Sequence, residues 1–412
     1  MRPLTAFKPL KSLAEALAEL LERATPLAGT DTVTTFDADG RVLAQDAVSS
    51  LQVPPNDNSS MDGYAVRRAD VAAAGRVLPV SQRIAAGSAG DPLQPGTAAR
   101  IFTGAPVPEG ADAVLMQEDC EALDDGSSVR IHTVPAAGQW IRRAGEDITR
   151  GAVVLSAGTR LTPAELGLAA SIGLHQLQVA RRPRVALFST GDELVMPGDV
   201  PPEQMRPGAI YNSNRFFLRA MLLRLGCEVT DLGIVPDRRD ATVQALQKAS
   251  EAHDLILTSG GVSVGEEDHI KPAVESLGTL DLWQIAMKPG KPFAYGRIGS
   301  AHFMGLPGNP VSSFLTFALL VRPFLLRLQG VQAVAPRALP GTAHFAWPRA
   351  DKRREFLRVR HNAAGGLDLF SNQSSGVLTS AAWGDGVVDN PAGQTIAPGD
   401  TVQFIAFAEL LA

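Results

Sequence analysis

The pattern of apolar and polar positions changes character along the chain. Residues 11–24 place four leucines on one helical face, with Glu and Arg opposite, which predicts an amphipathic helix. Residues 30–143 carry short β-branched runs broken by Gly and Pro, such as TDTVTTF and RVLPVSQRI, which predict a small β domain. The sequence TPAE at 162–165 is a capping box with proline at the first helical position, so a helix begins there. Its continuation to Gly173 could pack against the N-terminal helix, which would make the first domain discontinuous.

From about residue 182 to 330 the pattern alternates between buried-strand runs and helices. RVALFST and DLILTSG are strand-like, NRFFLRAMLLRLG is helical, and NPVSSFLTFALLVRPFLLRL predicts a long apolar helix. This alternation is typical of a doubly wound, mostly parallel sheet. In such sheets ligands bind beyond the carboxyl ends of the strands. The loops STGDE, GIVPD, SGGVSVGEED and GLPGNP all follow predicted strands, so we expect them to line one rim.

The remaining segments predict a linker and a fourth domain. The segment at 330–343 is typical of a linker, and the runs beyond it predict a small C-terminal β-barrel-like domain. The expected fold class is therefore multidomain α/β: a central doubly wound α/β nucleotide-binding domain, two small β-rich domains and a discontinuous helical/β domain. The expected boundaries are 1–48 with 144–181, then 49–143, 182–331 and 332–412.

Composition narrows the class of protein. A chain of 412 residues exceeds what one hydrophobic core usually supports. No apolar run reaches the roughly 18 residues of a membrane span, and the N-terminus lacks the apolar region of a signal peptide. Two distant cysteines, Cys120 and Cys227, fit a reducing cytoplasm, and no CxxC or HExxH indicates zinc. A net charge of −5 argues against a general nucleic-acid surface, although basic groups gather locally in IRRAGED and KPGKP.

The stretch LTSGGVSVGEED at 257–268 is compatible with three kinds of site. A phosphate-binding P-loop would place Lys after the second glycine, where this chain has Glu266. Gly261, Ser263 and Gly265 spell the G-x-S-x-G of a serine hydrolase, with His302 downstream. However, an elbow serine follows its strand directly, and here small residues intervene.

The third possibility explains more of the stretch. Glycines let backbone N–H groups approach a phosphate closely, and a following helix adds its positive N-terminus. The acidic residues that follow would repel phosphate unless a hard cation such as Mg²⁺ lies between them. For Glu266 and Glu267, taken individually, the alternative is that they are solvent-exposed residues at the start of a helix without a binding role.

GLPGNPVSSF at 305–314 supplies a second candidate anion site. Asn309 is a helix-capping residue type, Pro310 suits the first helical position, and Ser312 offers a hydroxyl. KPGKP adds Lys288 and Lys291 on a proline-stiffened loop, as compact charges suited to an oxyanion. A well-capped turn without ligand would give the same GLPGNP spacing.

Seven segments, in order, resemble the molybdopterin molybdenumtransferases, the family that includes the C-terminal domain of gephyrin. They are NSSMDGYAV, IFTGAPVPEGADAVLMQED, IRRAGEDI, STGDEL, SGGVSVGEED, MKPGKP and GLPGNPVS. The resemblance implies a cytoplasmic enzyme that binds adenylylated molybdopterin and molybdate, inserts the metal and releases AMP with the help of Mg²⁺. It also implies an elongated homodimer, joined through its first domain, with a cleft built by both chains.

The resemblance implies roles for individual positions. Catalytic positions would be Asp62, Thr103, Asp147, Glu193, Asp237 and Asp268. Glu193, Asp237 and Asp268 would also bind the metal ion. Substrate-binding positions would be Arg142, Gly260, Gly261, Ser263, Gly265, Lys288, Lys291, Pro292, Pro307, Pro310, Ser312, Arg358 and Ser375. Asp62 could instead fix a local turn through its side chain.

The chemistry of these residue types suits the implied reaction. Molybdate is a small dianion, so lysines, an arginine and a helix N-terminus provide charge and directed donors. Cleavage of a phosphoanhydride needs Mg²⁺ and positioning rather than a strong protein nucleophile. Expected protein partners are the molybdopterin adenylyltransferase of the preceding step and apo-molybdoenzymes, with no membrane or nucleic acid. Alternatives are a tungstate-loading relative and a scaffold protein on the same fold. The scaffold is disfavoured because the sequence begins near the first domain, without a fused adenylyltransferase domain.

Overall fold

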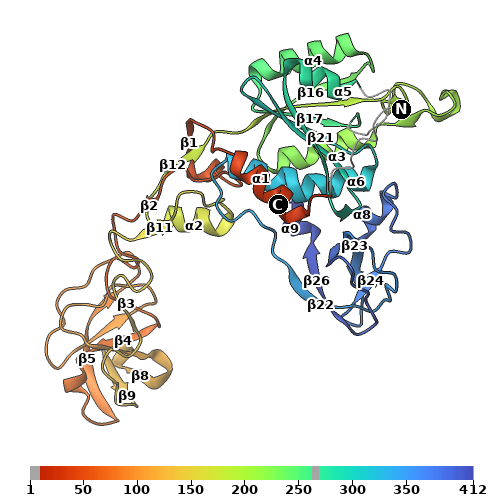
Figure 1. Cartoon of the computed structure of the whole chain (residues 1–412). Coiled ribbons are helices and arrows are strands. Elements are labelled where there is room, and N and C mark those ends of the chain that lie inside the picture. Colours follow the sequence, from red (N-terminus) through yellow and green to blue (C-terminus); the bar gives the residue numbers. More distant parts are fainter. Residues whose placement is uncertain (1–9, 262–268, 412) are drawn as a thin grey trace, which may run out of the picture.

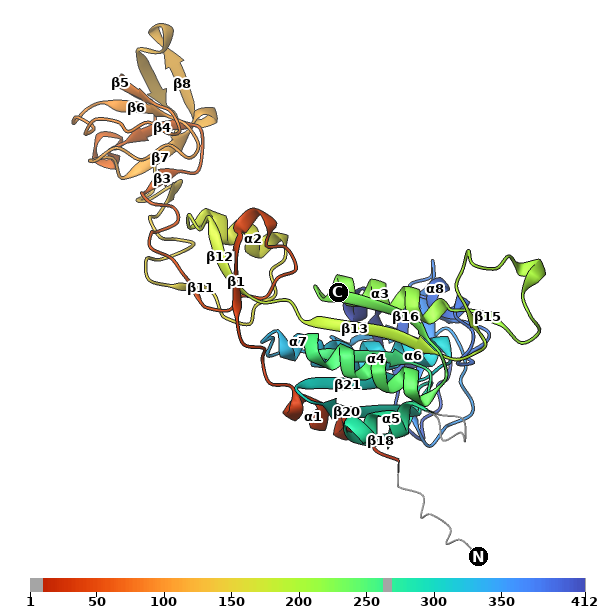
Figure 2. The ribbon, with the colours of Figure 1, turned by 90° about the horizontal axis from the view of Figure 1, so that it is seen from above.

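The protein is elongated, with a small β unit at one end and the α/β unit at the other (Figures 1 and 2). The structure, a computed structural model, describes residues 10–261 and 269–411. Between the two ends lies the unit that contains helix α2 (Pro163–Ser171). The multidomain α/β fold class predicted from the sequence is confirmed.

A six-stranded sheet forms the centre of the α/β unit, and its four parallel strands end at one edge. Its order is β16 (Glu228–Val235), β13 (Arg184–Thr190), β17 (Leu255–Ser259), β21 (Ala301–Leu306), β20 (Pro292–Ile298) and β18 (Gly278–Gln284). The first four are mutually parallel, and the last two pair antiparallel. Since parallel strands need crossovers, the connecting helices lie on both faces.

Helices cover both faces of the sheet and bury two apolar layers. One face carries α3 (Ser213–Arg224) and a long helix made of α6 (Pro310–Thr316), the π-helical turn η6 (Phe317–Val321) and α7 (Arg322–Leu328). The opposite face carries α4 (Arg239–Ala252) and α5 (Ile270–Leu277).

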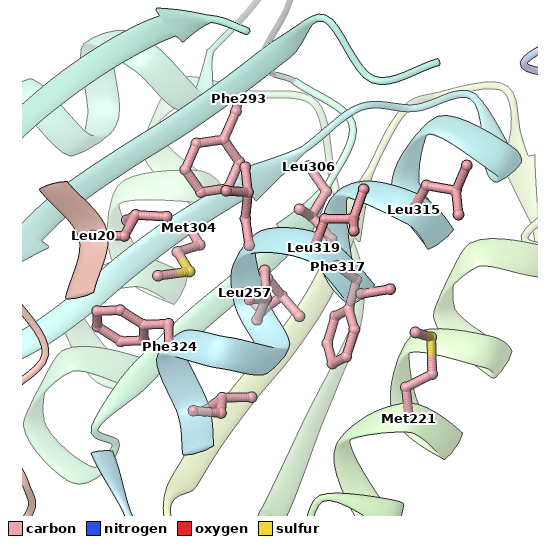
Figure 3. Close-up of a cluster of buried hydrophobic side chains, with 14 of the residues drawn as sticks. Leu20, Met221, Leu257, Phe293, Met304, Leu306, Leu315, Phe317, Leu319 and Phe324 are labelled. Carbon is pink, nitrogen blue, oxygen red and sulfur yellow. The ribbon is translucent and has the colours of Figure 1, made fainter. Parts of the chain in front are cut away.

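The long helix is the centre of the first apolar layer. Phe317 and Phe324 project from it toward Leu257 and Met304 of the sheet (Figure 3). The expectation that no apolar run reaches the length of a membrane span is wrong, because among the described residues Pro310–Leu328 has that length and apolar content. However, 94% of that window is buried inside the protein. Its apolar character is therefore explained by core packing.

The N-terminal helix α1 (Leu13–Arg23) belongs to this same core, which corrects the expectation that it packs against α2. Leu20 is fully buried against the long helix, and α1 contacts η6 and α7. The Lys11 N–H also donates a 2.8 Å hydrogen bond to the Gln284 carbonyl at the edge of the central sheet. The long helix offers α1 a broad apolar surface, whereas α2 has its own small core. Both α1 and α2 begin at the capping boxes that their sequences contain.

The chain leaves and re-enters the α2-containing unit through two short antiparallel pairs. Strand β1 (Thr30–Thr34) pairs with β12 (Gln176–Ala180), and β2 (Ala47–Val48) pairs with β11 (Val153–Leu155). In the sequence between β2 and β11, six strands form the sheet of the distal β unit. Its order is β7 (Ala113–Met116), β4 (Gly63–Val66), β6 (Ala98–Ile101), β5 (Arg76–Ile84), β9 (Ser128–Ile131) and β8 (Cys120–Leu123).

The C-terminal sheet is joined directly to the α/β unit. Its order is β19 (Met287–Lys288), β23 (Arg354–His361), β25 (Gly386–Asn390), β26 (Thr401–Ala406) and β22 (Leu339–Thr342), with β24 (Leu367–Leu369) paired to β23. Strand β19 precedes the linker in sequence, so one strand of this sheet is contributed by the α/β segment. We propose four domains with the boundaries expected from the sequence, except that α1 packs with the third.

Short elements complete the described structure. They are strands β3 (Asn58–Ser59), β10 (Ile141–Arg142), β14 (Leu194–Val195) and β15 (Ile210–Tyr211), helices α8 (Thr379–Trp383) and α9 (Phe407–Leu411), and 3₁₀ turns η1 (Thr35–Asp37), η2 (Arg68–Asp70), η3 (Gln117–Asp119), η4 (Asp124–Gly126) and η5 (Pro202–Gln204).

Candidate functional site

A cavity of about 590 Å³ lies at the carboxyl edge of the central sheet. It lies where the loops after β13, β16, β17 and β21 meet the beginnings of α3 and α6. Its lining residues are Thr190, Gly191, Glu193, Leu194, Ile210, Tyr211, Asn212, Ser213, Asn214, Asp237, Ser259, Gly260, Gly261, Pro292, Pro307, Gly308, Asn309, Pro310 and Ser312. The described parts of the loops that were expected to share one rim therefore do so, and from the glycine loop these are Ser259, Gly260 and Gly261.

A buried hydrogen-bond network shapes the cavity wall. The Asn214 Nδ2 group donates 2.7 Å hydrogen bonds to the Ser259 hydroxyl and to the Gly308 carbonyl. Asn212 caps α3, because its side-chain oxygen accepts from the Arg215 N–H at 3.3 Å. Neither asparagine was identified from the sequence, although an Asn-Ser-Asn run just before a predicted helix is a capping signal that could have found Asn212.

The second residue of the glycine loop after β17, Gly261, occupies a position that requires glycine. Gly261 has φ +67°, and a Cβ there would lie 2.5 Å from Cγ1 of Ile270. The close approach of backbone to helix α5 therefore requires glycine. Three residues assigned from the sequence, Ser263, Gly265 and Asp268, lie outside the described residues.

Two carboxylates on different loops line the cavity. Glu193 follows β13, and Asp237 follows β16. The described part of the chain holds no group of three or more His, Cys, Asp or Glu side chains placed to bind a metal ion. Mg²⁺ needs no such cage, since it is commonly bound by one or two carboxylates, water and substrate phosphates. The donor set of Glu193 and Asp237 therefore fits Mg²⁺ held together with a phosphate.

The beginning of α6 presents a helix N-terminus to the same cavity. Asn309 occupies the cap position, but its side chain makes no capping hydrogen bond to the helix. The Val311 N–H instead donates a 2.9 Å hydrogen bond to the carbonyl of Ser375 in the C-terminal domain. The next residue, Ser312, is 4% exposed and lines the cavity. The first turn of α6 therefore lies at the junction of the third and fourth domains.

Arg358 is a buried cation at this junction. It is 1% exposed, and its guanidinium donates to Ser380 Oγ at 3.0 Å and to the carbonyls of Phe356 and Ser374 at 3.1 and 3.2 Å. Burial lowers the pKa of Arg358 to about 10, so the side chain stays charged at neutral pH. Arginine has five N–H donors, three of which make these bonds, and Arg358 does not line the cavity.

The two lysines of KPGKP have different surroundings. The Lys288 ammonium lies 3.0 Å from Glu355 Oε1 and 3.3 Å from Asp351 Oδ2, and it does not line the cavity. Lys291 is exposed, and the neighbouring Pro292 lines the cavity. The loop thus connects the cavity to the C-terminal domain.

The remaining assigned residues lie in or beside the distal β unit. Asp62 Oδ1 accepts 2.8 Å hydrogen bonds from both the N–H and the hydroxyl of Thr103, and these bonds lower the pKa of Asp62. The carboxylate therefore joins two loops rather than closing a local turn. Arg142 and Asp147 are both exposed. Figures 1 and 2 place this unit away from the α/β unit, so a single chain does not bring these four residues to the cavity.

His302 does not support the serine hydrolase alternative. In the parallel register it pairs with Leu255, at the start of β17, whereas the glycine loop follows Ser259 at the other end. Its Nδ1 lies 2.8 Å from the Tyr295 hydroxyl, and the ring is 6% exposed. Four residues of strand separate it from the rim, roughly 13 Å. His302 is a core histidine.

The fold and the cavity define a multidomain α/β protein with a candidate ligand site at the carboxyl edge of a doubly wound sheet. Residues 11–173 match the MoeA N-terminal region (domain I and II), residues 186–327 a probable molybdopterin binding domain, and residues 340–407 the MoeA C-terminal region (domain IV). The chain belongs to the family of the molybdopterin molybdenumtransferases, and the protein is a transferase.

Several relatives illustrate the extent of the similarity. The molybdopterin molybdenumtransferase of Haemophilus influenzae is 43% identical over 320 residues, which cover 77% of this chain and 78% of the relative. Molybdopterin molybdenumtransferase 2 of Mycobacterium tuberculosis is 38% identical over 91% of this chain and 93% of its own length. The crystal structure of a molybdopterin biosynthesis moeA protein from Pyrococcus horikoshii superposes with a TM-score of 0.82 at 27% identity, covering 97% of this chain and all of that one.

Proposed function

We propose that the protein inserts molybdenum from molybdate into adenylylated molybdopterin, cleaves the adenylate and releases AMP, giving the molybdenum cofactor. One observation carries the proposal: the carboxylates of Glu193 and Asp237 line the same cavity as the start of α6. Carboxylates and a helix N-terminus in one space suit a ligand whose phosphates are bound partly through a cation.

The nucleotide phosphates bind between the glycine loop and the two carboxylates in this proposal. Glu193 and Asp237 would hold Mg²⁺ together with phosphate oxygens, and the ion would supply neutralising charge at the phosphoanhydride. The backbone of Gly260 and Gly261 approaches the phosphates, and one carboxylate orients the attacking oxygen. The oxygen of a water molecule forms the new phosphorus–oxygen bond as the P–O–P bridge breaks, and the products are AMP and the molybdopterin phosphate. The proton of the water passes to solvent, so the protein contributes positioning and electrostatics.

Molybdate binds at the junction of the third and fourth domains. Arg358 supplies a fixed charge with unused donors, and Ser312 supplies a hydroxyl beside a helix N-terminus. Lys291 and Lys288 border this position from the KPGKP loop, and Pro307, Pro310 and Ser375 shape it. A dianion held there lies next to the cavity that takes the molybdopterin, which is the arrangement that metal transfer needs.

A second copy of the chain completes the site. Asp62, Thr103, Arg142 and Asp147 lie too far from the cavity to act within one chain, so we assign them to the opposite cleft of a symmetric homodimer. In a dimer with twofold symmetry, each distal β unit can reach the partner's α/β unit, and both sites are equivalent. The protein acts in the cytoplasm, receiving its substrate from the adenylyltransferase and passing the product to apo-molybdoenzymes.

The proposal is tested by reconstitution of an apo-molybdoenzyme. Purified protein is incubated with adenylylated molybdopterin, Mg²⁺ and molybdate, and the mixture is added to the apo-enzyme. We expect its activity to appear only when all four components are present. Replacing molybdate by tungstate tests the tungstate-loading alternative, because a protein selective for tungsten would consume substrate with tungstate and not with molybdate. Failure of the complete mixture with both oxyanions would contradict the proposal.

A further inference from the structure

Glu355 is a buried carboxylate whose two oxygens are both used. It is 1% exposed, and its Oε1 accepts from the Lys288 ammonium at 3.0 Å. Its Oε2 accepts a 2.7 Å hydrogen bond from the Trp347 indole N–H. A buried carboxylate is costly unless it is paired and hydrogen-bonded, and Lys288 and Trp347 supply both kinds of partner.

The ion pair of Lys288 and Glu355 joins two domains, because the two residues lie opposite each other on neighbouring strands of one sheet. Lys288 and Glu355 are register partners in the parallel pairing of β19 with β23, so their side chains share a face. The Arg354 N–H donates a 3.0 Å hydrogen bond to the Ala286 carbonyl and closes the same junction. Asp351 also contacts Lys288, at 3.3 Å, but it is shared with Arg353 at 2.9 Å. Of the two carboxylates, Glu355 is therefore the one that lies closer to the Lys288 ammonium and shares it with no arginine.

This junction fixes the loop that follows Lys288. Gly290, with φ +115°, packs against α6 so closely that a Cβ would lie 2.6 Å from the Thr316 hydroxyl. Pro292, two residues further, lines the cavity. On the other side of the junction, Arg358 follows Glu355 on the same strand. A displacement of β19 against β23 would thus move Lys288 and Pro292 relative to Arg358.

We propose that Glu355 is a positioning residue for oxyanion binding, which acts by holding Lys288 and so setting the KPGKP loop against Arg358. The inference rests on the proposed function for its consequence in catalysis. The negative charge beside Lys288 is part of the site's geometry, because it keeps the ammonium at the domain junction instead of in solvent.

The test is a double-mutant cycle on molybdate-dependent AMP release. Glu355→Gln keeps an oxygen for the Trp347 N–H and removes the charge that holds Lys288. We expect it to raise the KM for molybdate about tenfold and to change kcat less than about twofold, since binding geometry rather than chemistry is altered. In the Lys288→Met background the same substitution should change KM less than about twofold, because Glu355 acts through Lys288. Equal effects in both backgrounds, or no effect on KM in the wild-type background, would overturn the proposal.

Asp389→Asn is the matched control. Asp389 pairs with Arg354 across the neighbouring strands of the same sheet, so this variant removes an ion pair of the junction without removing a partner of Lys288. It should leave the KM for molybdate unchanged. A rise in KM equal to that of Glu355→Gln would show that any weakening of the sheet has the same result, which would refute a positioning role.

A second measurement needs no activity and separates this inference from the proposed function. Limited proteolysis within the linker at 330–343 reports how firmly the C-terminal domain is docked. Glu355→Gln and Lys288→Met should each accelerate cleavage, and the double variant should be cleaved no faster than the faster single variant. If wild-type protein released no AMP but this pattern held, the proposed function would fail and the junction would stand. Additive acceleration would refute the coupling of the pair.

Discussion

The amide of Asn214 donates a 2.7 Å hydrogen bond to the hydroxyl of Ser259 inside the protein, which ties the start of α3 to the end of β17. A second bond of the same length runs from the amide to the Gly308 carbonyl. One side chain therefore sets the spacing of three of the segments that line the cavity. In the proposed function, this spacing determines whether a nucleotide can lie beside the two carboxylates.

Asn214→Ala is expected to damage both stability and substrate binding. It removes two hydrogen bonds and leaves the buried hydroxyl of Ser259 without its donor, which costs about 1–3 kcal/mol of the free energy of unfolding. Substrate affinity should fall as well, because the loops on either side lose their common anchor. Urea unfolding and equilibrium binding of the nucleotide substrate measure the two effects. Asn56→Ala, at an exposed asparagine, is the control, and a loss of equal size there would contradict the role of Asn214.

Arg358→Lys keeps a positive charge and should still impair oxyanion use. Lysine cannot donate simultaneously to Ser380, Phe356 and Ser374, so its ammonium will not occupy the position of the guanidinium. We expect the KM for molybdate to rise about tenfold or more. Steady-state AMP release at varied molybdate concentrations gives the value, with Arg337→Lys at an exposed position as the control. An unchanged KM would remove Arg358 from the oxyanion site.

Inactive variants from opposite ends of the molecule should complement each other. Asp62→Asn alters the distal β unit, and Asp237→Asn alters the cavity. If each site takes one residue from each chain, a mixed dimer has one site with both native residues and one site with neither. Random mixing of the two variants in co-expression should then restore about a quarter of wild-type activity. The same co-expression of Asp237→Asn with Glu193→Gln, both in the cavity, should restore none. Absence of complementation in the first pair, with each variant still dimeric, would argue against a shared cleft.

Acid should destabilise the α/β unit through His302. Burial, with the nearby charge of Arg297, lowers the pKa of His302 to about 4 from the 6.5 of an exposed histidine. Between these values the unfolded chain binds a proton that the folded chain does not, so the free energy of unfolding decreases as the pH falls. Between pH 7 and pH 5 the loss from this group is about 2 kcal/mol.

A comparison with His302→Gln isolates this contribution from those of acidic groups. Glutamine can hydrogen-bond to Tyr295 and does not titrate, so the variant should lose less stability between pH 7 and pH 5 than the wild type. His132→Gln, at an exposed histidine, should follow the wild-type profile. Urea denaturation at the two pH values provides the data, and parallel profiles for wild type and His302→Gln would contradict the assignment.

The central sheet and the loops at its carboxyl edge could be predicted from the sequence, because both depend on the local pattern of residues. Buried runs ending in Gly, Asp or Pro indicated parallel strands, and the carboxyl ends of parallel strands lie together whatever the details of packing. The loops that carry Glu193 and Asp237 were predicted to line one rim on this basis, whereas the two residues themselves were assigned through the family resemblance. The structure brings both residues, with Ser312, to one cavity.

Properties that depend on tertiary contacts could not be predicted in this way. The helical periodicity of α1 indicates an apolar face but does not say which surface covers it. Lys288 is identified by charge and spacing, whereas its two carboxylate partners come from the C-terminal domain, more than sixty residues later. Asn214 was missed because a polar residue at the start of a helix gives no signal of what its side chain bonds.

The rate of AMP release as a function of molybdate concentration tests the central claim most directly. The claim is that nucleotide and oxyanion occupy adjoining parts of one site, so that cleavage of the adenylate is coupled to metal transfer. With saturating adenylylated molybdopterin and Mg²⁺, the rate should be near zero without molybdate and should rise to saturation as molybdate is added. A rate that is the same with and without molybdate would contradict the claim.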